Sequence, residues 1–207
     1  VTVLFDYYPD AGVNSEILVF AGKGNNAGDA FVVARRLICL ERKVRVFYWV
    51  DEKTYKGATL LNFNILKKMR AKFVKLDSAA DLSHYFTTSN GPFLVIDGIL
   101  GTGLKGNLEG IFRDVVELIN KHATDVVSLD IPSGVSGDTG QIHGVSLQSS
   151  LTISFGFPKF GHFLPPGASK RGKLVNVDIS LPPEFRHEGE SFLLTKRPLQ
   201  MLLKLRD

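Results

Sequence analysis

A glycine-rich turn lies between an apolar strand pattern and an apolar helix pattern near the start of the chain. Residues 17–20, Ile-Leu-Val-Phe, are typical of a buried parallel strand, and apolar residues recur at helical spacing from Phe31 onward. Between them residues 21–30 read Ala-Gly-Lys-Gly-Asn-Asn-Ala-Gly-Asp-Ala. Glycine lets the backbone approach a ligand, and the free amides at a helix start favour an anion. The segment therefore predicts a strand-to-helix turn that holds phosphates.

This turn differs from the two common phosphate-binding fingerprints. Gly22 and Gly24 are not followed by the third glycine of a dinucleotide fold, and no Gly-Lys-Ser/Thr follows as in a P-loop. Asn25 and Asn26 instead offer amide oxygens that suit a hard cation or a polar ring. The alternative interpretation is a tight turn in which an asparagine is left-handed and Asp29 caps the helix.

Composition sets limits on the fold and on the partners of the chain. With 207 residues and 44% hydrophobic residues, the chain can bury one sizeable core, and nothing demands two domains. The net charge of +4 is mild, and we interpret the basic run 67–72 as the solvent face of an amphipathic helix, so no nucleic-acid partner is expected. No apolar run is long enough for a membrane span, and we expect Cys39 to be buried. These features favour a reducing compartment, the cytoplasm.

Strand and helix patterns alternate through the first two thirds of the chain. This alternation is typical of βαβ units and predicts a doubly wound, Rossmann-like α/β fold, with a mostly parallel sheet between two helical layers. The Gly/Pro-rich stretch 156–172 is expected to be a long functional loop. The expected strands are 17–20, 43–49, 72–75, 93–97, 125–129 and two near 150–155 and 174–178; the expected helices are 28–41, 55–70 and 108–121, with a short segment at 79–86.

Two further strands end in carboxylates. Asp97 ends one apolar strand and leads into a second glycine-rich turn, and Asp130 ends another and precedes Pro132-Ser133-Gly134. Ligands of such sheets bind outside the carboxyl ends of the strands, so these residues should converge. Oxygen atoms of Asn26, Asp97 and Ser133 would suit an alkali or alkaline-earth ion. The alternative is that each aspartate only caps the next helix or fixes its loop.

The five histidines give no such signal. They are scattered along the chain without the spacing of zinc ligands, and a lone histidine is more often a surface or structural residue than a catalyst. They are His84, His122, His143, His162 and His187.

Four segments together resemble one known family. Residues 24–29, 97–104, 130–134 and 152–159 are similar, in order and spacing, to the successive signatures of the NAD(P)H-hydrate epimerases, the YjeF N-terminal domain family. The similarity runs over residues 17–183. It implies an isomerase that interconverts the R and S forms of hydrated NADH and NADPH (NADHX and NADPHX) at C6 of the nicotinamide ring, as repair of a damaged cofactor.

The resemblance also assigns roles to residues. Asn26, Asp97 and Ser133 would hold a potassium ion, and Asp130 would lie at the nicotinamide as the acid that becomes a base. Lys159 would be a proton partner or a phosphate ligand, and the alternative for it is a surface lysine. The residues implied in binding the phosphates and ribose are Asn25, Asn26, Ala27, Gly28, Asp29, Gly101, Thr102, Gly103, Leu104, Lys105, Gly106 and Asn107.

We expect one domain over residues 1–207, in which the segment before the first strand is shortened to Val1–Ser15. We also expect a linker helix at 192–207 that leads toward a missing dehydratase domain. The resemblance implies a homodimer and the dehydratase as a fused or separate partner. Ala27 stands where the family commonly has glycine, which places activity in doubt. The main alternative is a catalytically silent nucleotide-binding scaffold. An ordinary NAD-dependent oxidoreductase is less favoured, because this chain has no acidic residue at the usual distance after a Gly-x-Gly-x-x-Gly motif to bind the ribose.

Overall fold

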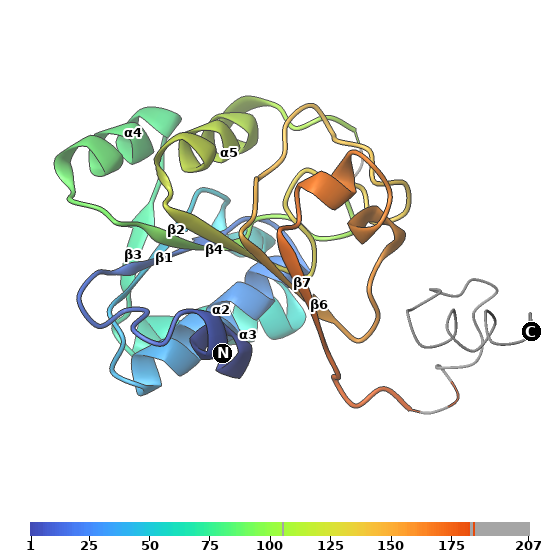
Figure 1. The fold of residues 1–207 in the computed structure, drawn as a ribbon. Coiled ribbons are helices and arrows are strands. Elements are labelled where there is room, and N and C mark those ends of the chain that lie inside the picture. Colours follow the sequence, from blue (N-terminus) through green and yellow to red (C-terminus); the bar gives the residue numbers. More distant parts are fainter. Residues whose placement is uncertain (105, 183, 185–207) are drawn as a thin grey trace, which may run out of the picture. The chain divides into compact units, whose positions relative to one another are not determined.

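The computed structural model describes residues 1–104, 106–182 and 184 (Figure 1). The chain divides into two units, Val1–Val177 and Asp178–Asp207. In the second unit, residues 178–182 are neither helix nor strand, and the Ser180 amide donates to the Asp178 carboxylate at 2.7 Å. The expected linker helix at 192–207 falls outside the described residues. All helices and strands discussed below belong to the first unit.

Seven parallel strands form the central sheet, in the order β3-β2-β1-β4-β5-β6-β7. The chain builds outward from β1 in one direction through β2 and β3, then returns to β1 and continues from β4 in the other direction. The switch point of the topology therefore lies between β1 and β4. The strands are β1 (Ile17–Ala21), β2 (Val44–Tyr48), β3 (Lys72–Lys75), β4 (Leu94–Gly98), β5 (Asp125–Leu129), β6 (Leu151–Phe155) and β7 (Lys173–Val177).

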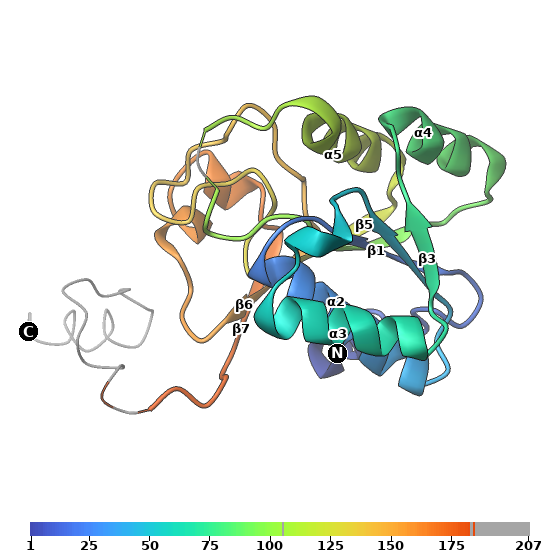
Figure 2. The same ribbon diagram turned by 180° about the vertical axis from the view of Figure 1, so that it is seen from behind.

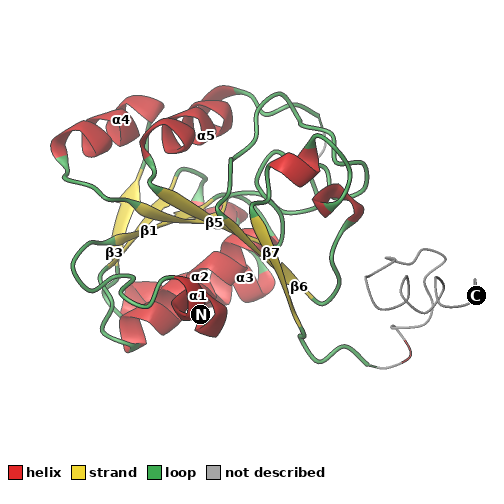
Figure 3. Cartoon of the chain, in the orientation of Figure 1, coloured by secondary structure: helices red, strands yellow, loops and turns green. Residues whose placement is uncertain are grey.

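Helices cover both faces of this sheet. Figures 1 and 2 show α1 (Thr2–Tyr7), α2 (Asn25–Cys39) and α3 (Gly57–Lys68) on one face, and α4 (Ala79–Thr88) and α5 (Gly110–His122) on the other. Short 3-10 helices occur at η1 (Glu52–Thr54), η2 (Phe160–His162) and η3 (Gly167–Ser169). The loops that follow β4, β5 and β6 gather at one end of the sheet (Figure 3).

Strand β1 lies inside the sheet, between β2 and β4, and explains why the fold forms. Every residue of β1 is fully buried, and successive side chains point to opposite faces. Ile17 and Val19 join the core under α2 and α3, whereas Leu18 and Phe20 join the core under α4 and α5. One apolar run therefore supplies both hydrophobic cores, which confirms the doubly wound α/β prediction.

The predicted elements are found with small changes in their bounds. Strands 72–75 and 125–129 have the same bounds as β3 and β5, and the short segment 79–86 is part of α4. Helix α2 begins at Asn25 rather than residue 28, and α5 begins at Gly110 rather than residue 108. Helix α1 has no counterpart among the predicted elements.

One expectation about the core was wrong. Cys39 is exposed, because the buried positions of α2 follow Ala34 and Leu37 and residue 39 falls on the opposite side of the helix. The basic run 67–72 begins at the solvent side of α3, where Lys67 pairs with Glu52 at 2.8 Å. Among the described residues, none of the helices has the length and apolarity that a membrane crossing requires.

Candidate active site

The first glycine-rich turn packs tightly against the end of β4. A Cβ atom at Gly22 would lie 2.2 Å from the Ile99 carbonyl oxygen, so only glycine fits there. The hydroxyl of Tyr55 donates to the Gly22 carbonyl at 3.2 Å, and that of Thr59 donates to the Gly24 carbonyl at 3.2 Å. The turn is therefore fixed from both the sheet and α3.

The amides that begin α2 receive no side-chain cap. Gly24 is the N-cap, with a positive φ of 93°, and has no side chain to accept a hydrogen bond from the first turn. No acidic residue stands in that first turn either. The uncapped amides follow directly on the turn, so the start of α2 can accept an anion, and phosphate binding there stays a prediction.

The predicted binding residues of α2 lie on different sides of the helix. Asn25 and Asp29 are exposed, while Ala27 and Gly28 are buried. A Cβ at Gly28 would lie 2.7 Å from the Thr59 hydroxyl oxygen, so this glycine serves the contact with α3. Partial desolvation, followed by the negative charge of Asp130, raises the pKa of Asp29 to about 6. That electrostatic interaction links the start of α2 to the end of β5.

Asp97 is a fully buried carboxylate at the switch point. Its oxygens accept hydrogen bonds from the Ser133 hydroxyl at 2.6 Å, the Ser133 amide at 2.9 Å, the Ser128 hydroxyl at 2.7 Å and the Ile99 amide at 3.1 Å. Burial raises the pKa of Asp97, and these hydrogen bonds oppose the rise. The carboxylate thus ties the ends of β4 and β5 together.

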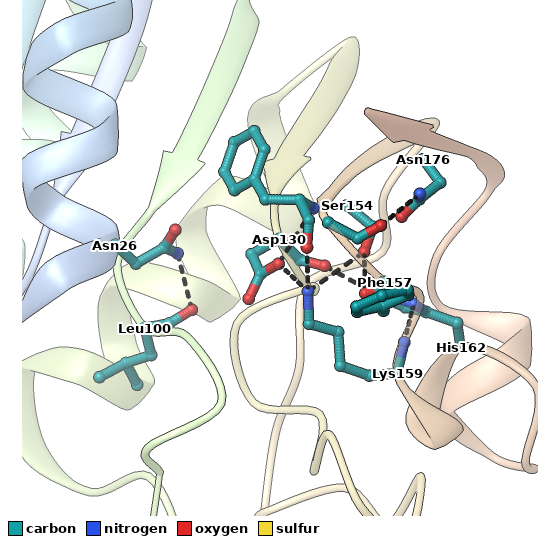
Figure 4. A network of polar contacts seen from close by, with 10 residues as sticks. Asn26, Leu100, Asp130, Ser154, Phe157, Lys159, His162 and Asn176 are labelled. Carbon is teal, nitrogen blue, oxygen red and sulfur yellow. Dashed lines mark hydrogen bonds and ion pairs between the residues drawn. The ribbon is translucent and has the colours of Figure 1, made fainter. Parts of the chain in front are cut away.

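Asn26 joins this network and leaves one polar atom unpaired. Its side-chain amide donates to the Leu100 carbonyl at 2.9 Å (Figure 4). The Ser133 hydroxyl accepts from the Leu100 amide at 2.9 Å. The structure therefore brings Asn26, Asp97 and Ser133 into one cluster. Within the described part of the chain, the buried Asn26 Oδ1 atom has no hydrogen-bond partner. A buried amide oxygen without a hydrogen-bond donor can bind a hard cation, and the cation would then supply the partner that the oxygen lacks.

The second glycine-rich turn is open to solvent and borders the loops after β5 and β6. A Cβ at Gly137 would lie 3.0 Å from Thr102 and 3.7 Å from the Lys159 side chain, so these residues are neighbours. The Leu108 amide donates to the His143 carbonyl at 2.9 Å. A Cβ atom at Gly103 or Gly106 would meet no other atom within 4 Å, and only Gly106 has a positive φ, 75°. Lys105 lies outside the described residues.

Helix α5 begins later than the sequence indicates, at Gly110 rather than residue 108. The helix begins at Gly110 with Glu109 as its N-cap, so the amides that follow Gly103 are not the first amides of a helix. A carboxylate at the N-cap also adds a negative charge near the helix start. Any phosphate contact of this turn would therefore use loop amides rather than the helix dipole.

Asp130 and Lys159 form an ion pair across the ends of β5 and β6 (Figure 4). The Lys159 ammonium also donates to the Ser154 hydroxyl and the Phe155 carbonyl, both at 3.2 Å. The Phe155 amide donates to the Asp130 carboxylate at 3.3 Å. The side chains of Asp130 and Lys159 are 19% and 21% exposed, so the pair is mostly sheltered yet reachable. A carboxylate and an ammonium in contact can exchange protons with a ligand.

His162 lies in the same cluster, although no sequence pattern singled it out. Its ring is fully buried, its Nδ1 atom accepts from the Lys159 amide at 3.0 Å, and its Nε2 atom lies 2.9 Å from the Asp130 carbonyl oxygen. Desolvation is the main cause that lowers the pKa of His162 to about 4. Its proximity to Lys159 in the chain was the one available signal, since both lie in the loop that follows β6.

The sequence is similar to proteins of one family. A family described as YjeF-related protein N-terminus matches residues 4–161. The chain is 38% identical over 169 residues to the bifunctional NAD(P)H-hydrate repair enzyme Nnr of Moorella thermoacetica, covering 82% of this chain and 32% of that protein. It is 31% identical over 172 residues to the NAD(P)H-hydrate epimerase of Nitrosopumilus maritimus, covering 83% of this chain and 76% of that protein.

A solved structure has the same fold. The crystal structure of yeast ynu0, YNL200c, superposes with a TM-score of 0.71 at 22% identity, covering 93% of this chain and 81% of that chain. The chain spans about a third of the length of the bifunctional relatives that it matches, with 32% and 36% of two of them covered.

Proposed function

We propose that this chain, which belongs to the family of YjeF-related protein N-termini, is an NAD(P)H-hydrate epimerase that interconverts the R and S forms of NADHX and NADPHX. The observation that carries the proposal is the sheltered Asp130–Lys159 pair at the carboxyl ends of β5 and β6. It lies at the same edge of the sheet as the uncapped start of α2. Relatives named NAD(P)H-hydrate epimerase supply the substrate class.

In this proposal the two turns hold the dinucleotide and the ion pair faces its hydrated ring. Asn25 to Asp29 would contact the phosphates and ribose through the start of α2, and Gly101 to Asn107 would border them through loop amides. The nicotinamide end would then lie at Asp130. The buried Ala27 and Gly28 would act through their backbone and through the packing of α2, because their side-chain positions face the protein.

Epimerisation at C6 requires one bond to break and to form again on the opposite face. If the C6 hydroxyl leaves, it takes up a proton from the Asp130–Lys159 pair and departs as water. Water then adds to the other face of the ring, and the pair takes back one proton, so atoms and charge balance. If the ring C–N bond opens instead, the same pair takes the hydroxyl proton and returns one. Either route needs one group that is acid and then base.

A potassium ion is part of the proposal. The unpaired Asn26 Oδ1, together with oxygens of Asp97 and Ser133, would hold it at the switch point. A bound cation would offset the charge of the buried Asp97 carboxylate and add positive potential beside the phosphate-binding turn. We also infer a homodimer and, as for the bifunctional relatives, a dehydratase acting on the same substrate.

Incubation with separated R and S NADHX, followed by chromatography, tests the function. The protein should bring either epimer to the equilibrium mixture faster than buffer alone. Asp130→Asn and Lys159→Met should each lower kcat by at least ~100-fold, the scale for removal of a general acid or base. Lys67→Met removes an exposed lysine of another ion pair, with Glu52, and should leave kcat unchanged.

The same assay separates the scaffold alternative. If ADP-ribose binds by calorimetry and the wild-type protein does not speed epimerisation, the chain is a nucleotide-binding scaffold and the proposal is wrong. Normal turnover by both Asp130→Asn and Lys159→Met would keep the function and remove the catalytic assignment.

A further inference from the structure

His162 connects the backbones of the two residues that form the ion pair. Its Nδ1 atom accepts from the Lys159 amide at 3.0 Å, and its Nε2 atom contacts the Asp130 carbonyl at 2.9 Å. The ring is fully buried, and the His162 carbonyl accepts from the Arg171 guanidinium at 2.6 Å. Both ring nitrogens therefore contact protein atoms of a fully buried residue, and Figure 4 shows the ring beside Lys159 and Asp130.

These partners fix the proton of the ring. A backbone amide can only donate, so Nδ1 must be the acceptor and carry no proton. A carbonyl can only accept, so Nε2 must carry the proton and donate it to Asp130. Only the neutral Nε2–H tautomer satisfies both contacts, and a charged ring would place two donors against each other at Lys159.

Asp130 needs such support because its backbone is strained. Its φ of 67° lies in the left-handed region, which a residue with a side chain adopts at a cost. The Asp130 amide donates to the Ile153 carbonyl at 2.8 Å, which holds one side of the residue. The His162 ring holds the carbonyl on the other side. The strained conformation is thereby kept where the carboxylate meets Lys159.

We propose that His162 is a positioning residue, which locks the Asp130 carbonyl and the Lys159 amide so that the carboxylate and ammonium meet in a reactive geometry. This inference rests on the proposed function only in that the pair is catalytic. The ring itself touches no substrate and transfers no proton. Its role is to hold two loops, those after β5 and β6, in one register.

Three substitutions at this position separate the two hydrogen bonds. His162→Phe keeps a flat ring and loses both, and it should lower kcat by about 10- to 100-fold with little change in KM, because the pair is misplaced while the binding turns are intact. His162→Gln retains a donor for Asp130, and His162→Asn retains an acceptor for Lys159. Each should recover about tenfold in kcat over His162→Phe, the value of one hydrogen bond.

Two measurements do not depend on activity. Nitrogen-15 spectra of the histidine rings should show His162 as a single neutral Nε2–H tautomer at pH 7. Acetylation mapped by mass spectrometry should modify Lys159 at least ~5-fold faster in His162→Phe than in the wild type, with exposed Lys67 as the internal reference. His84→Gln, an exposed histidine of α4, is the matched control and should change neither kcat nor Lys159 labelling.

The outcomes distinguish the two proposals. If the wild type does not epimerise NADHX but the spectra and labelling are as expected, the proposed function fails and the bridging role of His162 stands. If the wild type is active and His162→Phe, shown to be folded by circular dichroism, keeps normal kcat, the positioning role is wrong. The positioning role is also wrong if the His162 ring averages between tautomers, or if His162→Phe raises KM without lowering kcat. If His162→Phe does not fold, the kcat values of His162→Gln and His162→Asn decide whether the role stands.

Discussion

The buried ring of His162 should make the stability of this protein depend on pH. Its pKa in the folded state is lowered from 6.5 to about 4, first by desolvation. The Lys159 and Arg171 charges lower it further, whereas the hydrogen bond to the Asp130 carbonyl and the Asp130 charge raise it. Protonation would also break the contact of Nδ1 with the Lys159 amide. The folded state therefore resists protonation more than the unfolded chain does.

The sign and size follow from proton linkage. Between pH 6.5 and 4 the unfolded histidine binds a proton that the folded one does not, so the free energy of unfolding falls as pH falls. One such group changes it by at most about 1.4 kcal/mol per pH unit, or about 3 kcal/mol across the whole window. Above pH 6.5 the contribution of neutral His162 is fully present. Asp29, with its pKa raised to about 6, acts in the opposite direction over part of the window.

Urea unfolding at several pH values between about 7 and 4.5 measures this dependence. The wild type should lose about 2 to 3 kcal/mol more than His162→Gln over that range, because glutamine does not titrate. Asp29 and Asp97 remain in both proteins, so their effects cancel in the difference. His84→Gln is the control and should follow the wild type. Parallel curves for wild type and His162→Gln would refute the reasoning, since the ring would then not resist protonation.

Two further predictions concern the switch point. Gly98→Ala should lower the free energy of unfolding by about 1 to 3 kcal/mol in urea, because its Cβ would lie 2.3 Å from the Ala30 Cβ. Gly103→Ala is the control, since its Cβ would have no atom within 4 Å, and it should change that free energy by no more than about 0.5 kcal/mol. Equal losses in the two variants would contradict this packing. Replacing sodium by potassium at constant ionic strength should raise the unfolding temperature and kcat of the wild type but not of Asn26→Ala; identical results in both salts would remove the cation from the proposal.

The elements of the sheet could be predicted because their cause is local. All five residues of β1 are buried, and a parallel strand covered on both faces is necessarily a continuous apolar run. The convergence of Asp97 and Asp130 at one edge also follows from strand direction alone. Helix starts were less accurate because the N-caps are Gly24 and Glu109, and neither is one of the Ser, Thr, Asp or Asn residues whose side chains mark a helix start in a sequence.

The polar contacts of the site could not be predicted in the same way. His162 acts on the backbone carbonyl of Asp130, which every residue has, so no sequence pattern indicates that partner. The left-handed backbone of Asp130 is likewise imposed by the surrounding loops. Cys39 was misplaced for a simpler reason: its apolar neighbours outweighed its position on the helix, which is off the buried side set by Leu37.

Ala27 and Ala30 of α2 stand where the family resemblance leads us to expect glycine, and the structure accommodates both. Ala27 lies inside α2 and is absent from the residues with positive φ, so its methyl group causes no backbone strain. Ala30 brings its methyl group against β4, where residue 98 is glycine and leaves the space. Helix α2 and β4 therefore approach each other closely at Ala30 and Gly98. Alanine is more favourable than glycine inside a helix, so Ala27 and Ala30 also stabilise the first two turns of α2, where the uncapped amides lie.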